Sequence, residues 1–168
     1  TYSLAIMFLE LKPNIVEKAG LRIWGTDIDQ AAIKCSQQGI YPEDRFDNLH
    51  PELISNYFRR HPDGYQVRPL LKKMIHFQRE NLLAPGRSGF EGMDLIMCRN
   101  LLIYLEKEEQ MRLLLNFDRS LREGGYLVLG KTEFLFEPYR SKFEPISLPE
   151  RIYKKPFSSV VLEQAGGG

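Results

Sequence analysis

The most constraining feature of this sequence is the run MDLIMC at residues 93–98, which is apolar at five of its six positions. A run of this kind predicts a strand buried on both faces, which is typical of a parallel sheet covered by helices. A helical pattern follows over residues 107–122, and we expect Gly124-Gly125 to end it. The next strand is predicted at residues 126–129. Strand, helix and strand in this order indicate a parallel α/β sheet.

The first part of the chain shows the same order of elements. Residues 21–26 (LRIWGT) predict a short buried strand that ends at Asp27. Asp29 is a suitable N-cap for the next helix, which we expect to stop at Gly39. Upstream, apolar residues at helical spacing predict another helix, which Pro13 ends. The alternation predicts one open, doubly wound, mostly parallel α/β sheet of the Rossmann-like kind.

The segment from about residue 40 to 80 interrupts this alternation. Its sequence PDG at residues 62–64 is a turn signal. Two strands are predicted beside it, at residues 65–67 and 74–78, as a small antiparallel excursion in which Pro69 confines the first strand to an edge. No low-complexity tract marks a boundary, so we interpret the segment as an insertion within one domain.

Composition excludes several classes of function. The 23 basic and 22 acidic side chains leave a net charge of +1, which favours neither nucleic acid nor an anionic membrane as a partner. Cys35 and Cys98 are far apart, so neither a disulfide framework nor a zinc site is predicted, and a cytoplasmic location fits best. The three histidines have no metal-ligand spacing, and no apolar run approaches the ~20 residues that span a bilayer. No G-x-G-x-x-G follows a strand, which argues against a nicotinamide dehydrogenase.

Polar residues follow three of the predicted strands, where open α/β sheets bind their ligands. Asp27 is placed to accept hydrogen bonds from both hydroxyls of a ribose, or else it is only a turn residue. Asn81 can present its amide to an adenine edge while Leu82 packs on the ring, with an Asn-type turn as the alternative. Asn100 is followed four residues later by Tyr104, on the same face if the segment is helical. The alternative for this tyrosine is rim packing.

These motifs occur together, in order and at fitting intervals. They are YSLA at residues 2–5, TDID at 26–29, GIY at 39–41, NLL at 81–83, CRNLLIY at 98–104, GG at 124–125 and GKTE at 130–133. In this combination the chain resembles the C-terminal catalytic domain of the chemotaxis-receptor methyltransferases, the CheR family, over residues 1–155. The resemblance implies a class I methyltransferase fold in residues 1–156. It also implies an enzyme that uses S-adenosylmethionine, releases S-adenosylhomocysteine and esterifies glutamate side chains on the cytoplasmic helices of chemoreceptors.

The resemblance also implies the residues that hold the cofactor. Asp27, with Ile28 beside it, corresponds to the ribose-binding position. Asn81 and Leu82 correspond to the residues that bind the adenine.

The remaining site residues implied by the resemblance belong to the CRNLLIY motif. Asn100 and Leu101 correspond to residues along the methionine part of the cofactor. Tyr104 lines the methyl-transfer site, and Arg99 is assigned with it as catalytic. No metal is implied, because the sulfonium methyl is already activated and the reaction is mainly one of alignment.

Some parts of the family lie outside the resemblance, namely its first strand, its glycine-containing cofactor loop and an N-terminal helical domain that supplies an arginine. Residues 157–168 are interpreted as a tail or linker, although SSVVLEQ at residues 158–164 can also form an extra strand in the place of the missing one. The insertion at residues 40–80 corresponds to the family's β-subdomain, which in some members docks a receptor tail peptide. Here the stretch from Phe58 to Tyr65 is short, so that docking stays open. The alternative function is a non-catalytic module of a larger signalling protein that binds cofactor or receptor.

Overall fold

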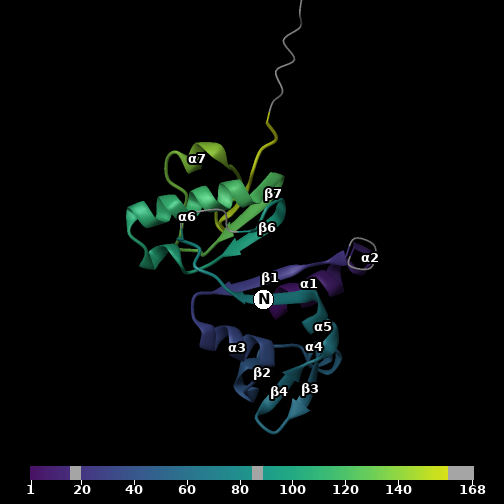
Figure 1. The fold of residues 1–168 in the computed structure, drawn as a ribbon. Helices are drawn as coiled ribbons and strands as arrows, with labels where there is room; N and C mark the ends of the chain where they lie inside the picture. Colours follow the sequence, from purple (N-terminus) through teal and green to yellow (C-terminus); the bar gives the residue numbers. More distant parts are fainter. Residues whose placement is uncertain (16–19, 85–88, 159–168) are drawn as a thin grey trace, which may run out of the picture. The chain divides into compact units, whose positions relative to one another are not determined.

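The computed structural model describes residues 1–15, 20–84 and 89–158 (Figure 1). The chain forms two compact units, Thr1–Asn81 and Leu82–Gly168, each with its own hydrophobic core. Each unit contains a pair of parallel strands with a helix packed against it. Parallel strands combined with helices of this kind define an α/β fold, which confirms the predicted fold class.

The first unit is built on the parallel pair β1 (Ile23–Asp27) and β5 (Ile75–Arg79). The two strands are in register along their whole length, so their carboxyl ends lie side by side. Helix α3 (Gln30–Gln38) packs against both strands. Two helices precede the pair, α1 (Tyr2–Leu11) and the single turn α2 (Pro13–Ile15). The helix predicted before Pro13 and the strand predicted before Asp27 are therefore confirmed.

Both ends of α3 are fixed by the residues that the sequence predicted. The side chain of Asp29 accepts a hydrogen bond from the backbone N–H of Ala31 at 2.8 Å, which satisfies an otherwise unpaired donor of the first turn. Gly39 ends the helix in the left-handed conformation, with φ 61°, and its N–H donates to the carbonyl of Cys35 at 3.0 Å. A glycine adopts this conformation without the steric cost that other residues carry.

A small antiparallel sheet follows α3, in the order β2 (Ile40–Tyr41), β4 (Gly64–Val67) and β3 (Phe58–His61). Two predictions for this region were wrong. The strand expected at residues 74–78 is β5, which pairs in parallel with β1, and β4 is the central strand of the small sheet. Pro69 lies beyond β4, in the first turn of helix α5 (Pro69–Met74), where a missing N–H costs nothing. An apolar run predicts a strand but does not identify its partner.

Two short helical segments connect β2 to β3. They are the 3-10 turn η2 (Glu43–Phe46) and helix α4 (Pro51–Tyr57). Pro51 occupies the first turn of α4, directly after His50, where a missing N–H leaves no helical hydrogen bond unmade. Phe58 follows the helix and begins β3.

The core of the first unit lies between α1, α5 and the strands. Ala5 and Leu71 are completely buried, and Val67 is 1% exposed. Aromatic rings add to this core through Tyr2, whose ring centroid lies 5.5 Å from that of Phe77. The helices therefore cover the parallel pair with apolar side chains, which leaves its carboxyl ends to the polar residues that follow.

The second unit contains a four-stranded sheet in the order β6 (Met93–Cys98), β7 (Leu121–Leu129), β9 (Ile152–Lys154) and β8 (Glu144–Ser147). The pair β6–β7 is parallel and is joined by helix α6 (Lys107–Ser120), while β9 and β8 are antiparallel to their neighbours. The predicted strand–helix–strand unit is confirmed, and β8 and β9 close the sheet as an antiparallel pair.

The boundary between α6 and β7 differs from the prediction. The helix ends at Ser120, and Gly124 and Gly125 lie inside β7. Gly124 has φ 75° and donates its N–H to the carbonyl of Lys155 at 2.8 Å. A Cβ on Gly125 would lie 2.9 Å from the carbonyl oxygen of Met93. The two glycines therefore let neighbouring backbones approach closely inside the sheet. In the sequence alone, such a pair looks the same as the glycines that end a helix.

Strand β6 is also less buried than its apolar sequence predicted. Within its sheet it is the edge strand, and Met97 is 49% exposed. The core of the second unit instead gathers around α6 and β7, where Leu113, Leu114 and Leu127 are completely buried. The short helix α7 (Tyr139–Lys142) adds Tyr139 to this core.

Candidate functional site

The carboxyl end of the parallel pair in the first unit carries Asp27 and Ile28. Asp27 is the last residue of β1, opposite Arg79 of β5, and its side chain is exposed. Its Oδ1 accepts a hydrogen bond from the backbone N–H of Asp29 at 2.9 Å. Ile28 is 60% exposed, and its carbonyl accepts from Nε of Arg79 at 2.9 Å. These bonds fix an exposed carboxylate at the end of the strand.

Asn81 lies at the same end of this pair. The backbone N–H of Glu80 donates to the carbonyl of Asp27 at 2.9 Å, so the chain leaving β5 runs beside the end of β1. Asn81 is the next residue and is exposed. The structure therefore brings Asp27, Ile28 and Asn81 to one edge, as expected of residues that follow neighbouring parallel strands.

Leu82 belongs to the second unit. It is partly buried and packs against that unit's core. Its carbonyl accepts from Nδ2 of Asn116, on α6, at 2.9 Å. Asn81 and Leu82, which were expected to bind the adenine together, are neighbours in the chain. Leu82 also packs against the core of the second unit.

The chain after β6 holds the remaining predicted residues. Arg99, Asn100 and Tyr104 are exposed, and Tyr104 is 78% exposed. Asn100 has φ 58°, a left-handed conformation that L side chains rarely adopt. Leu102–Tyr104 then form the 3-10 turn η3. An α-helix that would place Asn100 and Tyr104 on one face does not form, because the left-handed residue delays the helical turn.

Glu133 is a residue of this region to which the sequence assigned no role. It is 2% exposed, yet its carboxylate accepts four backbone hydrogen bonds. Oε1 accepts from the N–H groups of Leu101 at 2.8 Å and Leu102 at 2.7 Å. Oε2 accepts from those of Asn100 at 2.9 Å and Gly130 at 2.6 Å. The only sequence signal for this residue was its place in the GKTE motif, because three of its donors lie more than 30 residues away in the chain.

Cys98 lies beside Glu133 and carries the largest change in acidity in this region. Burial raises the pKa of the Cys98 thiol to about 12, and the charge of Glu133 adds to the effect. A thiol with this pKa stays protonated at neutral pH, so Cys98 cannot act as a thiolate nucleophile. The polar groups exposed after the end of β6 are therefore the guanidinium of Arg99, the amide of Asn100 and the hydroxyl of Tyr104.

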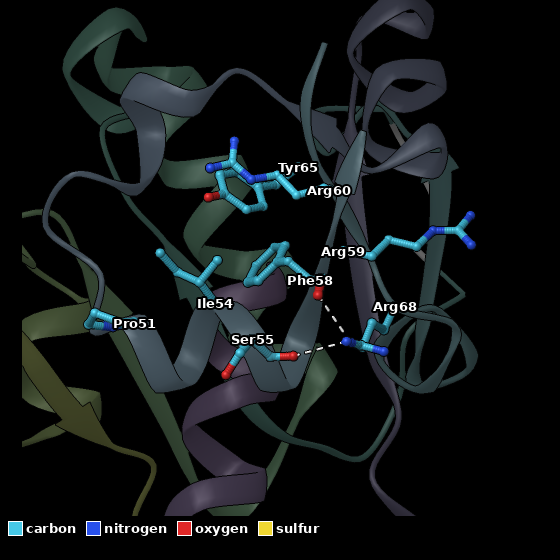
Figure 2. Close-up of a pocket in the computed structure, with 8 residues that line it drawn as sticks. All are labelled: Pro51, Ile54, Ser55, Phe58, Arg59, Arg60, Tyr65 and Arg68. Carbon is cyan, nitrogen blue, oxygen red and sulfur yellow. Dashed lines mark hydrogen bonds between the residues drawn. The ribbon is translucent and has the colours of Figure 1, made fainter. Parts of the chain in front are cut away.

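A separate hollow of about 460 Å³ lies on the first unit, beside α4 and the small sheet (Figure 2). Three arginines line it, and each has partners within the unit. Arg68 donates to the carbonyls of Phe58 and Ser55, both at 3.0 Å (Figure 2). The other two, Arg60 and Arg59, bind Glu43 at 2.7 Å and Gln66 at 2.9 Å. The three guanidinium groups therefore form hydrogen bonds within the first unit, and these structural contacts account for their position beside the hollow.

Within residues 1–15, 20–84 and 89–158, no three His, Cys, Asp or Glu side chains converge as metal ligands. In the same ranges, no helix has the length and apolar character needed to cross a bilayer.

Comparison with known proteins relates this arrangement to one family. The family model described as CheR methyltransferase, SAM binding domain, matches residues 1–152. A chemotaxis protein methyltransferase of Borreliella burgdorferi is 33% identical over 133 residues, which cover 79% of this chain and 47% of that protein. One from Klebsiella aerogenes is 35% identical over 137 residues, which cover 79% of this chain and 46% of that protein.

A third relative extends the similarity over almost the whole chain. An uncharacterized 104.1 kDa protein of Rhodobacter capsulatus is 31% identical over 168 residues, which cover 99% of this chain and 17% of that protein. This chain thus spans about half the length of the two chemotaxis methyltransferases and a smaller part of the third relative. The match to the family model covers the polar residues that follow β1 and β5 and those that follow β6. It identifies S-adenosylmethionine as the cofactor of the domain. The chain belongs to the CheR methyltransferase family, as its S-adenosylmethionine-binding domain.

Proposed function

We propose that this chain is the cofactor-binding and catalytic part of an enzyme that transfers a methyl group from S-adenosylmethionine to glutamate side chains of chemoreceptors. Such an enzyme acts in the cytoplasm, on the receptor's cytoplasmic domain. The observation that carries the proposal is the presence of the expected polar residues at the carboxyl ends of two strands, in a chain of the CheR methyltransferase family. The similarity to chemotaxis protein methyltransferases supports the chemoreceptor as substrate.

The first unit offers the groups that fit the adenosine part of the cofactor. Asp27 presents an exposed carboxylate whose orientation is fixed by the N–H of Asp29. A carboxylate in this place can accept hydrogen bonds from both ribose hydroxyls, with Ile28 against the sugar. Asn81 supplies an amide at the same edge for the adenine, and Leu82 follows it in the chain as an apolar contact.

The second unit offers the groups for the methionine part and for the substrate. Asn100 and Leu101 lie in a loop whose backbone is held at a buried carboxylate, so their orientation is fixed before any ligand binds. Arg99 is exposed and can hold the receptor's carboxylate by paired hydrogen bonds. Tyr104 extends from the 3-10 turn and can orient the same carboxylate with its hydroxyl.

The reaction places modest demands on these residues. S-adenosylmethionine would supply, when bound, a methyl group on a positively charged sulfur; a carboxylate oxygen would form a bond to the methyl carbon as the carbon–sulfur bond breaks, so that neutral S-adenosylhomocysteine leaves and no proton is transferred. The chain needs no thiolate or general base, in agreement with the raised pKa of the Cys98 thiol. Its residues must hold the glutamate in line with the methyl group and exclude water from the attacking oxygen.

The proposal is tested with the full-length polypeptide that contains this chain. It is mixed with S-adenosylmethionine labelled in its methyl group and with membranes that carry a chemoreceptor. We expect label in the receptor that alkali releases as methanol, because an ester is base-labile. A receptor whose methyl-accepting glutamates are changed to alanine is the control and is expected to gain none. Label that resists alkali, or no label in either receptor, would contradict the proposal.

Tyr104→Phe tests the role of the hydroxyl in this reaction. We expect turnover to fall about tenfold, because the substrate carboxylate loses an orienting contact. The melting temperature should not change, since Tyr104 is 78% exposed. Tyr126→Phe, a tyrosine of β7 in the same unit, is the matched control and is expected to keep full turnover. Full turnover in Tyr104→Phe would exclude an orienting role for this hydroxyl.

A second candidate function is a non-catalytic module within a larger signalling protein. The Rhodobacter relative favours it, because a similar domain occupies only 17% of that 104.1 kDa protein. Calorimetry with S-adenosylhomocysteine, performed beside the methyl-transfer assay, separates the two candidates. Binding without base-labile ester formation supports the module, and binding with ester formation supports the enzyme.

A further inference from the structure

Glu133 offers four acceptor positions, and backbone donors occupy all of them. Three donors come from the loop after β6 and one from the chain after β7. A carboxylate satisfies such a set completely, because both of its oxygens only accept hydrogen bonds. An amide of the same shape would direct an NH₂ group at two N–H donors. The arrangement is therefore specific for the carboxylate of Glu133 and not merely for a polar side chain.

The loop that Glu133 holds contains a residue in the left-handed region, Asn100, a conformation that is uncommon outside glycine although asparagine tolerates it better than most side chains. Asn100 has φ 58°, and the 3-10 turn Leu102–Tyr104 follows it within a few residues of the end of β6. Left-handed residues other than glycine persist where the surrounding structure imposes them. Glu133 imposes this one, since it binds the N–H of Asn100 and those of Leu101 and Leu102.

Gly130 closes the same arrangement from the β7 side. Its N–H donates to Oε2 of Glu133 at 2.6 Å, and its carbonyl accepts from the N–H of Glu133 at 2.9 Å. A Cβ on Gly130 would lie 2.6 Å from Oδ1 of Asn100 and 2.6 Å from Oε2 of Glu133. The side chain of Asn100 therefore lies directly against the backbone of Gly130, and this contact limits where its amide can point.

We infer that Glu133 is a positioning residue for cofactor binding: through the backbone of Asn100, Leu101 and Leu102, it fixes the orientation in which Asn100 and Leu101 meet the methionine part of S-adenosylmethionine. The inference rests on the proposed cofactor roles of Asn100 and Leu101. Glu133 itself does not touch the ligand, because its oxygens are fully used by the four N–H groups. Its effect reaches the reaction only through the loop.

The direct test measures the affinity of Glu133 variants of the full-length polypeptide for S-adenosylhomocysteine by calorimetry. We expect Glu133→Gln to bind at least about tenfold more weakly, because two backbone donors lose their acceptors and the loop shifts. Glu133→Asp keeps the charge but shortens the reach, so an intermediate affinity is expected. This partial rescue by aspartate distinguishes a requirement for the carboxylate from a requirement for side-chain volume.

Kinetics separate positioning from a simple loss of folded protein. An unfolded fraction lowers the apparent kcat and leaves both KM values unchanged. A displaced loop raises KM for S-adenosylmethionine, and KM for the receptor rises with it where Arg99 and Tyr104 of the same segment are displaced as well. Leu121→Ala is the matched control, since Leu121 is 2% exposed and lies at the opposite end of the parallel pair, paired with Met93. We expect Leu121→Ala to lower the melting temperature but to keep the dissociation constant within about twofold of the wild type.

Gly130→Ala decides the question if Glu133→Gln does not fold. This variant keeps the carboxylate of Glu133, but its added Cβ would lie 2.6 Å from Oε2 of Glu133 and from Oδ1 of Asn100. We therefore expect the same rise in KM for S-adenosylmethionine. Wild-type KM in a folded Glu133→Gln, or in Gly130→Ala when Glu133→Gln is unfolded, would overturn the inference, as would an equal affinity loss in Leu121→Ala. Failure of the wild type itself to bind S-adenosylhomocysteine would contradict the proposed function instead.

Discussion

Asp27 and Asp29 stand two residues apart, and the structure gives their carboxylates different tasks. Asp29 caps α3 by accepting from the N–H of Ala31, a task contained within the first turn. Asp27 is exposed at the strand end and accepts from the N–H of Asp29, which orients it outward from β1. A helix cap contributes to the stability of the fold, whereas an oriented carboxylate at the end of a strand is available to bind a ligand.

Substitution of the two aspartates by alanine should separate these tasks. Asp27→Ala is expected to weaken binding of S-adenosylhomocysteine by about tenfold or more, because the ribose hydroxyls lose a charged acceptor. Asp29→Ala should lower the free energy of unfolding by about 1 kcal/mol, the usual value of a helix cap, with little change in affinity. Calorimetry and urea denaturation of both variants measure the two effects. Equal affinities in the two variants would rule out ribose binding by Asp27.

Cys98 predicts a specific loss of stability at alkaline pH. Burial in the fold raises the pKa of its thiol from 9.0 to about 12, so the folded chain holds the proton more tightly than the unfolded chain does. The stability that this thiol contributes is complete below pH 9 and is lost as the pH rises toward about 12. Denaturation curves across that range should fall more steeply for the wild type than for Cys98→Ala. Parallel curves would contradict the assignment.

Individual residues differ in how far the sequence predicts their roles. Asp27, Asn81, Asn100 and Tyr104 could be recognised because each belongs to a short motif after a strand or at a turn. Glu133 could not be assigned a role, because its donors come from a distant part of the chain and from a left-handed residue. Because this buried carboxylate binds only backbone N–H groups, no oppositely charged residue in the sequence indicates its role.

At the scale of elements, local signals predicted the type of element well and its partners poorly. The caps of α3 and the turn before β4 were predicted correctly because they depend on residues next to one another. The parallel partner of β5 was not predicted, because a strand pattern of about five residues fits either kind of sheet. Gly124 and Gly125 were assigned to a helix stop for the same reason, since only the folded sheet shows the close approach that they permit.

The hairpin of the small sheet makes a prediction at this scale. Gly64 has φ 125°, and a Cβ there would lie 2.3 Å from the carbonyl oxygen of Tyr41. Gly64→Ala should therefore lower the free energy of unfolding by at least about 2 kcal/mol, since backbone cannot move aside cheaply. Gly20→Ala is the control, because Gly20 has φ 70° with nothing within 4 Å of its added Cβ, so only about 1 kcal/mol is expected. Equal costs, measured by chemical denaturation, would show that the small sheet tolerates a side chain at this position.

At the scale of the whole molecule, the proposed cofactor ligands come from both units. Asp27, Ile28 and Asn81 belong to the first unit, and Leu82, Asn100 and Leu101 belong to the second. The α/β class was predictable, because alternating strand and helix patterns recur in both halves of the chain. The division into two units was not predicted, because no change in composition marks it. The boundary falls inside the NLL motif, between two residues that the sequence assigned to one adenine site.

Binding of the cofactor has a measurable consequence in hydrogen exchange. Saturation with S-adenosylhomocysteine at about a hundred times its dissociation constant should stabilise the folded chain by about 2.7 kcal/mol. Beyond this general effect, we expect local protection at residues 27–31 and at residues 99–104, the segments that carry the proposed cofactor-binding residues. The hairpin turn at residues 62–64 is the internal control and should exchange at an unchanged rate. A segment that gains no protection would contradict the cofactor-binding role proposed for its residues.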